Sequence, residues 1–257
     1  MGAENNMIHF VGAGPGDPDL ITVKGRRLLE EADLVVYAGS LVPQALVENL
    51  KAETINSASL DLAAIIDTMA RAWQGGRKVV RLHTGDPSIY GAIREQMEGL
   101  DKLAVPYTIV PGVSSAFAAA ASLHAELTLP EVSQTVIITR RAGRTPVPKG
   151  QELKSLAGHG ATMLIFLSVA MIDEVVEELI AGGYPSSTPV AIVEKASWPE
   201  ERIIRGTLAD ISVKVREAGI RKTAIICVGD VFAQKNLHAV SKLYDRSFSH
   251  GCRDGAG

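Results

Sequence analysis

Three loops rich in glycine and proline, each directly after a short and mainly apolar run, constrain this fold more than any other feature of the sequence. The runs Ile8–Val11, Lys78–Leu82 and Tyr107–Val110 are short and contain β-branched residues, so they predict buried strands. The loops after them read GAGPGDP, HTGDPSIYG and PGVSS. Strands that alternate with helices predict a parallel sheet, and the loops after such strands gather at its carboxyl edge.

The rest of the first half fits this pattern. Leu34–Tyr37 predicts a fourth strand, and helices are expected over Val23–Ala32 and Gly91–Leu100. A further amphipathic helix, ended by two glycines, is indicated by an apolar stripe at helical spacing formed by Leu62, Ile65, Ile66, Met69 and Trp73. The first half therefore predicts an α/β domain with a parallel sheet, which we place at residues 1–113.

The second half predicts another α/β domain, at residues 114–233, with more hairpins and a mixed sheet. It opens with an alanine-rich helix over Ser115–Ala121, and the apolar periodicity predicts a helix over Ile172–Ile180. Strands are expected over Thr135–Thr139, Thr162–Leu167, Val190–Glu194, Arg202–Arg205 and Ala224–Val228. Hydrophobicity falls after residue 233, so we expect residues 234–257 to form a flexible tail.

Charge and composition exclude several classes of function. Lys and Arg number 26 against 29 Asp and Glu, a balance that argues against a nucleic-acid partner. The six histidines show no paired ligand spacing, so we expect no metal site. The two cysteines, Cys227 and Cys252, form no disulfide framework and fit a reducing cytoplasm. We expect neither an export signal nor a membrane partner, because the sequence has no apolar stretch of spanning length.

The first loop resembles a dinucleotide-binding turn only in part. Gly12 and Gly14 follow a strand, but the position of the third glycine in GxGxxG is occupied by Asp17. A carboxylate there would repel a pyrophosphate, and two prolines stiffen the turn. The alternatives are a rigid strand-to-helix turn and a loop that approaches a ligand without phosphate.

The Gly-Asp-Pro loop favours a nucleoside-like ligand. The carboxylate of Asp86 can accept hydrogen bonds from hydroxyl or amino groups, while Gly85 lets a ligand lie against the main chain. A simple Asx turn explains one such loop on its own, but it does not explain three loops of this composition at equivalent places.

A basic segment predicts a site for an acidic substrate. Residues 139–149 carry four cations and no acid, in a chain with a net charge of −3. Arginine binds carboxylates through a planar, bidentate fork, so Arg140, Arg141 and Arg144 are the substrate-binding candidates. The alternative is a solvated loop that is basic without a ligand.

Together, five segments resemble the tetrapyrrole (corrin) methyltransferases that use S-adenosylmethionine. The segments are GAGPGDPDLITVKG, VVRLHTGDPSIYGAI, VPGVSSAFAAAA, TVIITRRAGRTPVP and KASWP, and the likeness runs from about residue 7 to residue 231. The resemblance implies two α/β domains with the cofactor in a trough between them, a homodimer, and a tetrapyrrole substrate. It also implies methyl transfer to a ring carbon of a corrin precursor in cobalamin biosynthesis.

The resemblance also implies which residues contact the cofactor. By position in the family's motifs they are Pro15, Thr84, Gly85, Asp86, Ile89, Ser114, Ser115, Leu167 and Ala196. For a general base the sequence offers three candidates without choosing among them, Asp17, His83 and Tyr90.

Two alternatives stay open on the sequence. The substrate can be cobalt-free or already contain cobalt, and segments 38–40 and 241–245 favour the cobalt-free branch. A protein of another class, a non-catalytic nucleoside-binding regulator, would keep the cofactor loops but would have no use for the arginine segment.

Overall fold

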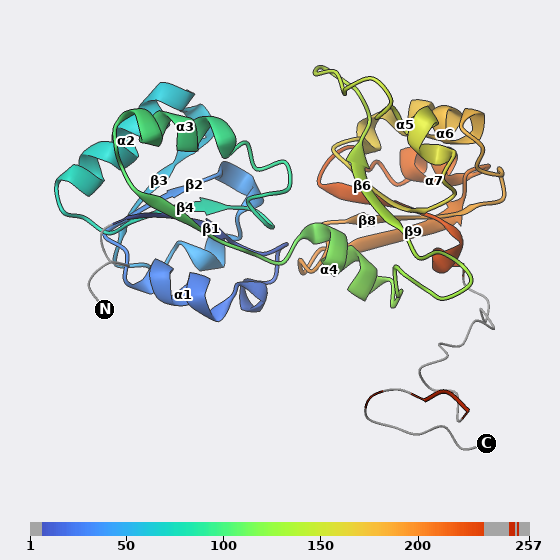
Figure 1. The fold of residues 1–257 in the computed structure, drawn as a ribbon, viewed down its shortest axis with the longest axis horizontal. Helices are drawn as coiled ribbons and strands as arrows, with labels where there is room; N and C mark the ends of the chain where they lie inside the picture. Colours follow the sequence, from blue (N-terminus) through green and yellow to red (C-terminus); the bar gives the residue numbers. More distant parts are fainter. Residues whose placement is uncertain (1–6, 234–246, 250, 252–257) are drawn as a thin grey trace. The chain divides into compact units, whose positions relative to one another are not determined.

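The computed structural model describes residues 7–233, 247–249 and 251. The chain divides into two compact units, each of which is described by itself (Figure 1). The first unit ends at Ala118 and regains Ser197–Pro199, while the second unit runs through Ala119–Ala196 and resumes at Glu200. The predicted domain boundary after Val113 lies five residues before this division (118 minus 113). Most of the predicted tail lies outside the described residues.

The first unit contains a five-stranded parallel sheet in the order β3-β2-β4-β1-β5. Its strands are β1 (Ile8–Gly12), β2 (Leu34–Tyr37), β3 (Glu53–Asn56), β4 (Val79–His83) and β5 (Tyr107–Val110). The sheet is covered on both faces, by α1 (Val23–Glu30) on one and by α2 (Leu62–Gln74) and α3 (Arg94–Lys102) on the other (Figure 1).

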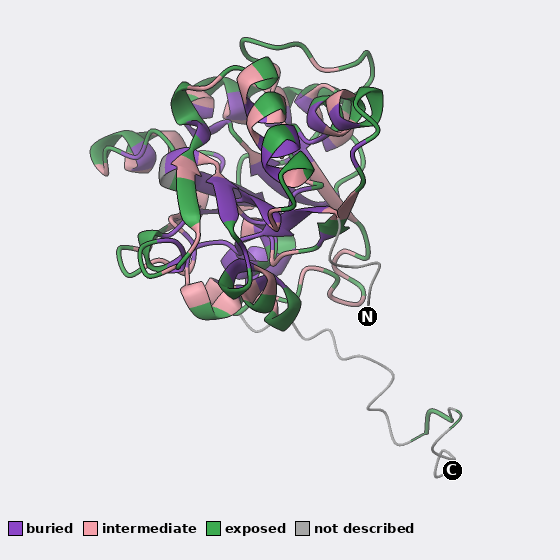
Figure 2. Cartoon of the chain, turned by 90° about the vertical axis from the view of Figure 1, so that its left-hand side faces the viewer, coloured by how far each residue is buried: buried purple, intermediate pink, exposed green. Residues whose placement is uncertain are grey.

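Both faces of this sheet are apolar, as a parallel sheet between helices requires. Ile8 and Phe10 of β1 pack in the core beneath α2 and α3, whereas Val11, the next residue along, packs with Leu29 of α1. Figure 2 shows the buried strands of this unit between helices whose outer faces are exposed.

The second unit contains a mixed sheet in the order β6-β7-β10-β8-β9. Only β6 and β7 pair in parallel, and the other neighbours are antiparallel. The strands are β6 (Val136–Arg140), β7 (Thr162–Phe166), β8 (Pro189–Glu194), β9 (Arg202–Thr207) and β10 (Ala224–Val228). Residues of α5 (Leu153–Ala157), α6 (Ile172–Ala181) and α7 (Ile211–Glu217) pack with this sheet in one core.

The remaining elements are short. The alanine-rich segment forms α4 (Ser115–Ser122), which spans the division between the units. The described residues also contain six 3₁₀ helices, namely η1 (Pro18–Leu20), η2 (Gly39–Leu41), η3 (Gln44–Leu46), η4 (Ser57–Ser59), η5 (Val169–Met171) and η6 (Asp230–Phe232).

The predicted fold class, a parallel-sheet α/β domain followed by a mixed-sheet α/β domain, is confirmed. Among the strands and α-helices of the described residues, three were not predicted. Strand β3 is a mostly exposed edge strand without apolar alternation, while α5 and α7 are each at most two turns long. The third helix starts at Arg94 and not at Gly91, because Tyr90 and Ala92 have φ values of 55° and 48°, which no α-helix accommodates.

Candidate functional site

The three glycine-rich loops meet at one edge of the first sheet, as the sequence predicts, because β4, β1 and β5 are neighbours in it. The first two loops are joined by a short antiparallel bridge in which the Gly85 N–H donates to the Gly14 carbonyl at 2.8 Å and the Gly14 N–H returns a bond at 3.3 Å. The Ala13 N–H adds a third bond, to the His83 carbonyl at 2.7 Å.

Glycine is required at the point where these loops cross. A β-carbon on Gly112 would lie 2.2 Å from the Gly85 carbonyl oxygen, and one on Gly12 would lie 2.6 Å from both that oxygen and the Gly112 α-carbon. Contacts this short are forbidden, so any side chain would push the main chains apart. The cluster formed by Gly12, Gly85 and Gly112 is here called the glycine junction, and it lets the main chains of the three loops pack directly against one another.

Asp86 connects two of the loops. One of its carboxylate oxygens accepts a hydrogen bond from the Ser88 N–H at 2.8 Å and a short one from the Ser88 hydroxyl, and the other accepts from the Gly112 N–H at 2.9 Å. Partial burial raises the pKa of Asp86, but these hydrogen bonds outweigh it and hold the pKa below the ordinary value. Asp86 is therefore a carboxylate at neutral pH.

The first loop is held by the segment that returns to this unit. The Asp17 N–H donates to the Ser197 hydroxyl at 3.0 Å, and the Trp198 indole N–H donates to the Pro15 carbonyl at 2.8 Å. The indole lies directly against Gly16, where a β-carbon would overlap it. Trp198 thus packs on the loop, and the Asp17 side chain caps η1 by accepting from the Asp19 N–H at 2.9 Å.

The cofactor residues implied by the resemblance fall into two groups. Those of the first unit all lie on the three loops, where Pro15, Gly85 and Ser114 are buried while Thr84, Asp86, Ile89 and Ser115 are partly exposed. In the second unit, Leu167 follows β7 and Ala196 follows β8, and the alternating strand directions bring both strand ends to one edge of that sheet. Leu167 is 70% exposed and has a φ of 55°, an unusual conformation for a leucine.

The arginine segment leaves β6 at the same edge of the second sheet. The guanidinium of Arg140 donates to the carbonyls of Arg141, Thr145 and Pro146 in its own loop. Arg141 forms a half-buried ion pair with Glu178 at 2.7 Å. Arg144 is exposed and makes no side-chain hydrogen bond or ion pair to another described residue, so it is the candidate that is free to meet a substrate.

The three candidate bases differ in their surroundings. Asp17 is partly exposed, and Tyr90 is 44% exposed on a strained backbone. His83 is buried, and its ring stacks on Phe10 with centroids 6.0 Å apart. Burial, with a smaller effect of the Arg81 charge, lowers the pKa of His83 to about 3, so its imidazole is neutral at neutral pH.

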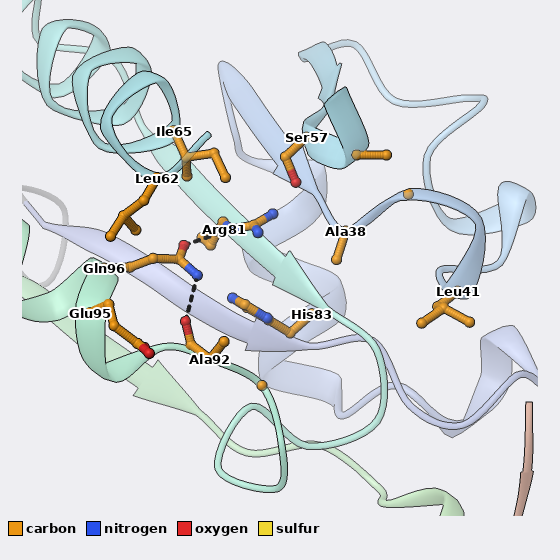
Figure 3. Close-up of a pocket in the computed structure, with 13 residues that line it drawn as sticks. Ala38, Leu41, Ser57, Leu62, Ile65, Arg81, His83, Ala92, Glu95 and Gln96 are labelled. Carbon is orange, nitrogen blue, oxygen red and sulfur yellow. Dashed lines mark hydrogen bonds between the residues drawn. The ribbon is translucent and has the colours of Figure 1, made fainter. Parts of the chain in front are cut away.

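A pocket of about 550 Å³ opens between the carboxyl ends of β2 and β4 and the start of α3 (Figure 3). Its polar lining includes Arg81, His83 and Gln96, all buried. Arg81 and Gln96 were missed on the sequence. The sequence signal for Arg81 was a cation inside the otherwise apolar strand VVRLH. Its partner Gln96 lies fifteen residues further along the chain, so the local sequence carried no sign of the contact.

Two kinds of feature are absent from the described residues. No helix in that part of the chain is both long and apolar enough to cross a membrane. No group of three or more histidine, cysteine or acidic side chains there is arranged to hold a metal ion.

Comparisons with known proteins agree on a family. A family model described as tetrapyrrole (corrin/porphyrin) methylases matches residues 7–212. A cobalt-precorrin-4 C(11)-methyltransferase of Methanocaldococcus jannaschii is 59% identical over 251 residues, covering 97% of this chain and 96% of the relative. A precorrin-4 C(11)-methyltransferase of Pseudomonas aeruginosa is 51% identical over 249 residues, covering 96% of this chain and 99% of the relative.

Solved structures give the same answer. A cobalt-precorrin-4 methyltransferase of cobalamin biosynthesis superposes with a TM-score of 0.87 at 48% identity, covering 90% of this chain and 97% of that chain. A uroporphyrin-III C-methyltransferase from Thermus thermophilus, in complex with S-adenosylhomocysteine, superposes with a TM-score of 0.74 at 29% identity, covering 88% and 98% of the two chains.

Proposed function

The chain belongs to the tetrapyrrole (corrin/porphyrin) methylases, and on that basis we propose that it methylates precorrin-4 at C11 to give precorrin-5 in cobalamin biosynthesis. The observation that carries this proposal is near-complete coverage at 59% and 51% identity to relatives named as C11-methyltransferases of this substrate class. The test is mass spectrometry of the tetrapyrrole after incubation with S-adenosylmethionine. Gain of one methyl group at C11 supports the proposal, and recovery of unmodified precorrin-4 contradicts it.

S-adenosylmethionine is the proposed methyl donor, and it supplies a methyl group on a positively charged sulfur. The three loops at the glycine junction suit its nucleoside part, because they offer backbone polar groups and the Asp86 carboxylate but no cation for a phosphate. The family's relation to a structure that contains S-adenosylhomocysteine supports this choice. Calorimetry should detect one site per chain for S-adenosylhomocysteine, whereas tighter binding of a nicotinamide dinucleotide would contradict it.

In the proposed reaction, the main task of the protein is to align the methyl donor with the acceptor carbon. In the transfer, the bond from the methyl carbon to sulfur breaks with its electron pair staying on sulfur. A π electron pair of the macrocycle at C11 forms the new bond to the methyl carbon, so the positive charge passes from sulfur to the macrocycle. Because positive charge disappears from the donor, the chain's residues need to hold the two molecules in line and exclude water. The glycine junction and the packing of Trp198 on Gly16 provide a rigid floor for this alignment.

Cobalt-precorrin-4 is a second candidate substrate. The relative that is 59% identical carries that name, whereas the relative that is 51% identical is named for precorrin-4. The cobalt would belong to the substrate, so the two reactions ask for the same protein groups. Competition between the two substrates in one reaction would rank them, and a preference of more than about tenfold for the cobalt form would make it the substrate.

For the assembly of the protein we propose a homodimer, which rests on the family resemblance. Light scattering of the purified chain, coupled to size-exclusion chromatography, measures the mass directly. A mass equal to that of one 27.3 kDa chain at the concentration used for activity would contradict the dimer.

A further inference from the structure

A buried arginine without an acidic partner lies in the first unit. Arg81 is 4% exposed, and its guanidinium donates only to neutral acceptors, the Gln96 side-chain oxygen at 2.9 Å and the Val36 carbonyl at 3.2 Å. No carboxylate among the described residues forms an ion pair with it. Burial lowers the pKa of Arg81 to about 10, so the group stays charged at neutral pH. Burial of an unpaired cation is costly, which makes this arrangement unusual for a purely structural residue.

A polar group beside Arg81, the His83 imidazole, lacks a hydrogen-bond partner among the described residues. His83 is 4% exposed, and neither ring nitrogen makes a hydrogen bond to another described residue, with Nε2 fully buried. Both side chains leave β4 on the face that carries Val79, toward α2 and α3, and they line the same pocket (Figure 3). A buried imidazole without a hydrogen-bond partner and a buried cation without a counter-ion line one cavity, and together they indicate an anionic ligand, since native proteins rarely leave such groups uncompensated.

The rest of the pocket limits what that ligand can be. Its walls include the apolar side chains of Leu41, Leu62 and Ile65. The Ser57 hydroxyl also lines it, but this group already donates its hydrogen bond to the Tyr37 carbonyl at 2.9 Å. The one acidic lining residue, Glu95, is exposed. A single guanidinium with a neutral imidazole matches one negative charge, which fits a carboxylate on an apolar arm better than a dianionic phosphate.

We infer that this pocket binds a carboxylate side chain of the tetrapyrrole substrate, with Arg81 as its ion-pair partner and an imidazole N–H of His83 as a second donor. The inference rests on the proposed function for the identity of the substrate. It assigns substrate recognition to residues of the first unit, whereas the arginine segment 139–149 belongs to the second unit.

The position of the pocket in the chain links it to the glycine junction. His83 directly precedes the loop that carries Thr84, Gly85 and Asp86, and Gly91 and Ala92 at the end of that loop also line the pocket. A carboxylate on Arg81 would therefore be held at the base of the loop that we propose to contact the methyl donor. Binding there would fix the macrocycle next to the donor.

The first test is Arg81→Met, which removes the charge and keeps much of the side-chain length. Arg71→Met, on an exposed face of α2, is the matched control. With the full-length enzyme, we expect the KM for the tetrapyrrole to rise about 10- to 100-fold in Arg81→Met, with kcat and the Kd for S-adenosylhomocysteine nearly unchanged. Thermal stability should hold or increase, because an unpaired buried charge is removed. Loss of stability without a change in KM would show a structural role and overturn the inference.

A second variant covers the case in which Arg81→Met fails to fold. Gln96→Glu places a carboxylate at hydrogen-bond distance from the Arg81 guanidinium, so that the protein supplies its own anion. We expect this variant to fold and to bind the tetrapyrrole as weakly as Arg81→Met does. A KM equal to that of the wild type in a folded Gln96→Glu enzyme would contradict the inference.

A binding measurement separates this inference from the proposed function. Fluorescence titration with uroporphyrin III, which carries carboxylate side chains, needs no methyl transfer. If the wild type fails to methylate precorrin-4 but loses uroporphyrin binding on Arg81→Met, the pocket stands and the proposed function falls. If the wild type methylates precorrin-4 and neither variant changes KM or uroporphyrin binding, the function stands and the pocket assignment falls.

Discussion

The carboxylate of Asp86 accepts a hydrogen bond from the backbone N–H of Gly112 at 2.9 Å, which joins the loop after β4 to the loop after β5. The two strands are not neighbours in the sheet, since β1 lies between them. The contact therefore closes the top of β1 and fixes the spacing of the loops on either side of it. Asp86 both shapes the proposed cofactor site and presents a charge there.

For Asp86→Ala we expect S-adenosylhomocysteine to bind more weakly by about 1 to 3 kcal/mol, because a charged acceptor and the link to Gly112 are lost together. Isothermal titration calorimetry measures the change. Ser88→Ala is the control, since it removes a partner within the same loop and leaves the Gly112 bond. An unchanged affinity in folded Asp86→Ala would remove Asp86 from the cofactor site.

Gly112→Ala should disrupt the glycine junction. The added methyl group would lie 2.2 Å from the Gly85 carbonyl and 2.8 Å from the Gly12 α-carbon, so the main chains would have to separate. We expect a loss of about 1 to 3 kcal/mol in the free energy of unfolding, with cofactor binding reduced as well. Urea denaturation measures the change in the free energy of unfolding. Gly75→Ala is the control, because a β-carbon there would have its nearest atoms 3.4 Å away, and we expect its free energy of unfolding to change little.

In the arginine segment, we expect Arg141 to contribute to stability and Arg144 to contribute to substrate binding. Arg141→Ala breaks a half-buried ion pair with Glu178, so we expect the free energy of unfolding to fall by about 1 to 2 kcal/mol. Arg144→Ala removes an exposed cation and should change stability by less than about 0.5 kcal/mol. Thermal denaturation of the two variants compares these effects.

The same two variants should bind the cofactor product like the wild type, because a cationic sulfonium gains nothing from an arginine. Arg144→Ala is expected to raise the Kd for the tetrapyrrole about tenfold, in a salt-dependent manner. If wild type and Arg144→Ala bind the tetrapyrrole equally at low ionic strength, Arg144 does not bind the substrate and the segment is a solvated turn.

His83 should make stability depend on pH. Its folded pKa of about 3 lies below the ordinary value of 6.5, so between these two pH values the unfolded chain binds more protons than the folded chain. The contribution is fully present above pH 6.5 and is lost as the pH falls. Between pH 6.5 and about pH 4.5 the loss from this group should be roughly 2 to 3 kcal/mol.

Urea denaturation at several pH values tests this effect. His83→Gln should show a shallower fall in the free energy of unfolding below pH 6.5 than the wild type. His159→Gln, which changes an exposed histidine, should follow the wild type. Parallel curves for wild type and His83→Gln would contradict a buried, neutral imidazole.

Much of the fold and part of the site could be predicted from local sequence. The strands Leu34–Tyr37 and Tyr107–Val110 were predicted to the residue, because short apolar runs between glycine or polar segments determine strands locally. The convergence of the three loops also followed from the sequence, since parallel strands place their carboxyl ends at one edge. Strand β3 was not predicted because its residues are mostly exposed and show no apolar run. It is a strand because it pairs with β2, which the local sequence does not show.

The sequence by itself thus determined most of the strands and helices, the glycine loops and the family to which the chain belongs. Only the tertiary structure decided which cations have partners. Arg141 is paired by Glu178, 37 residues away, whereas Arg81 is buried with only neutral acceptors. The physical reason is that secondary structure responds to neighbours along the chain, but the solvation and pairing of a charge depend on residues that only folding brings near.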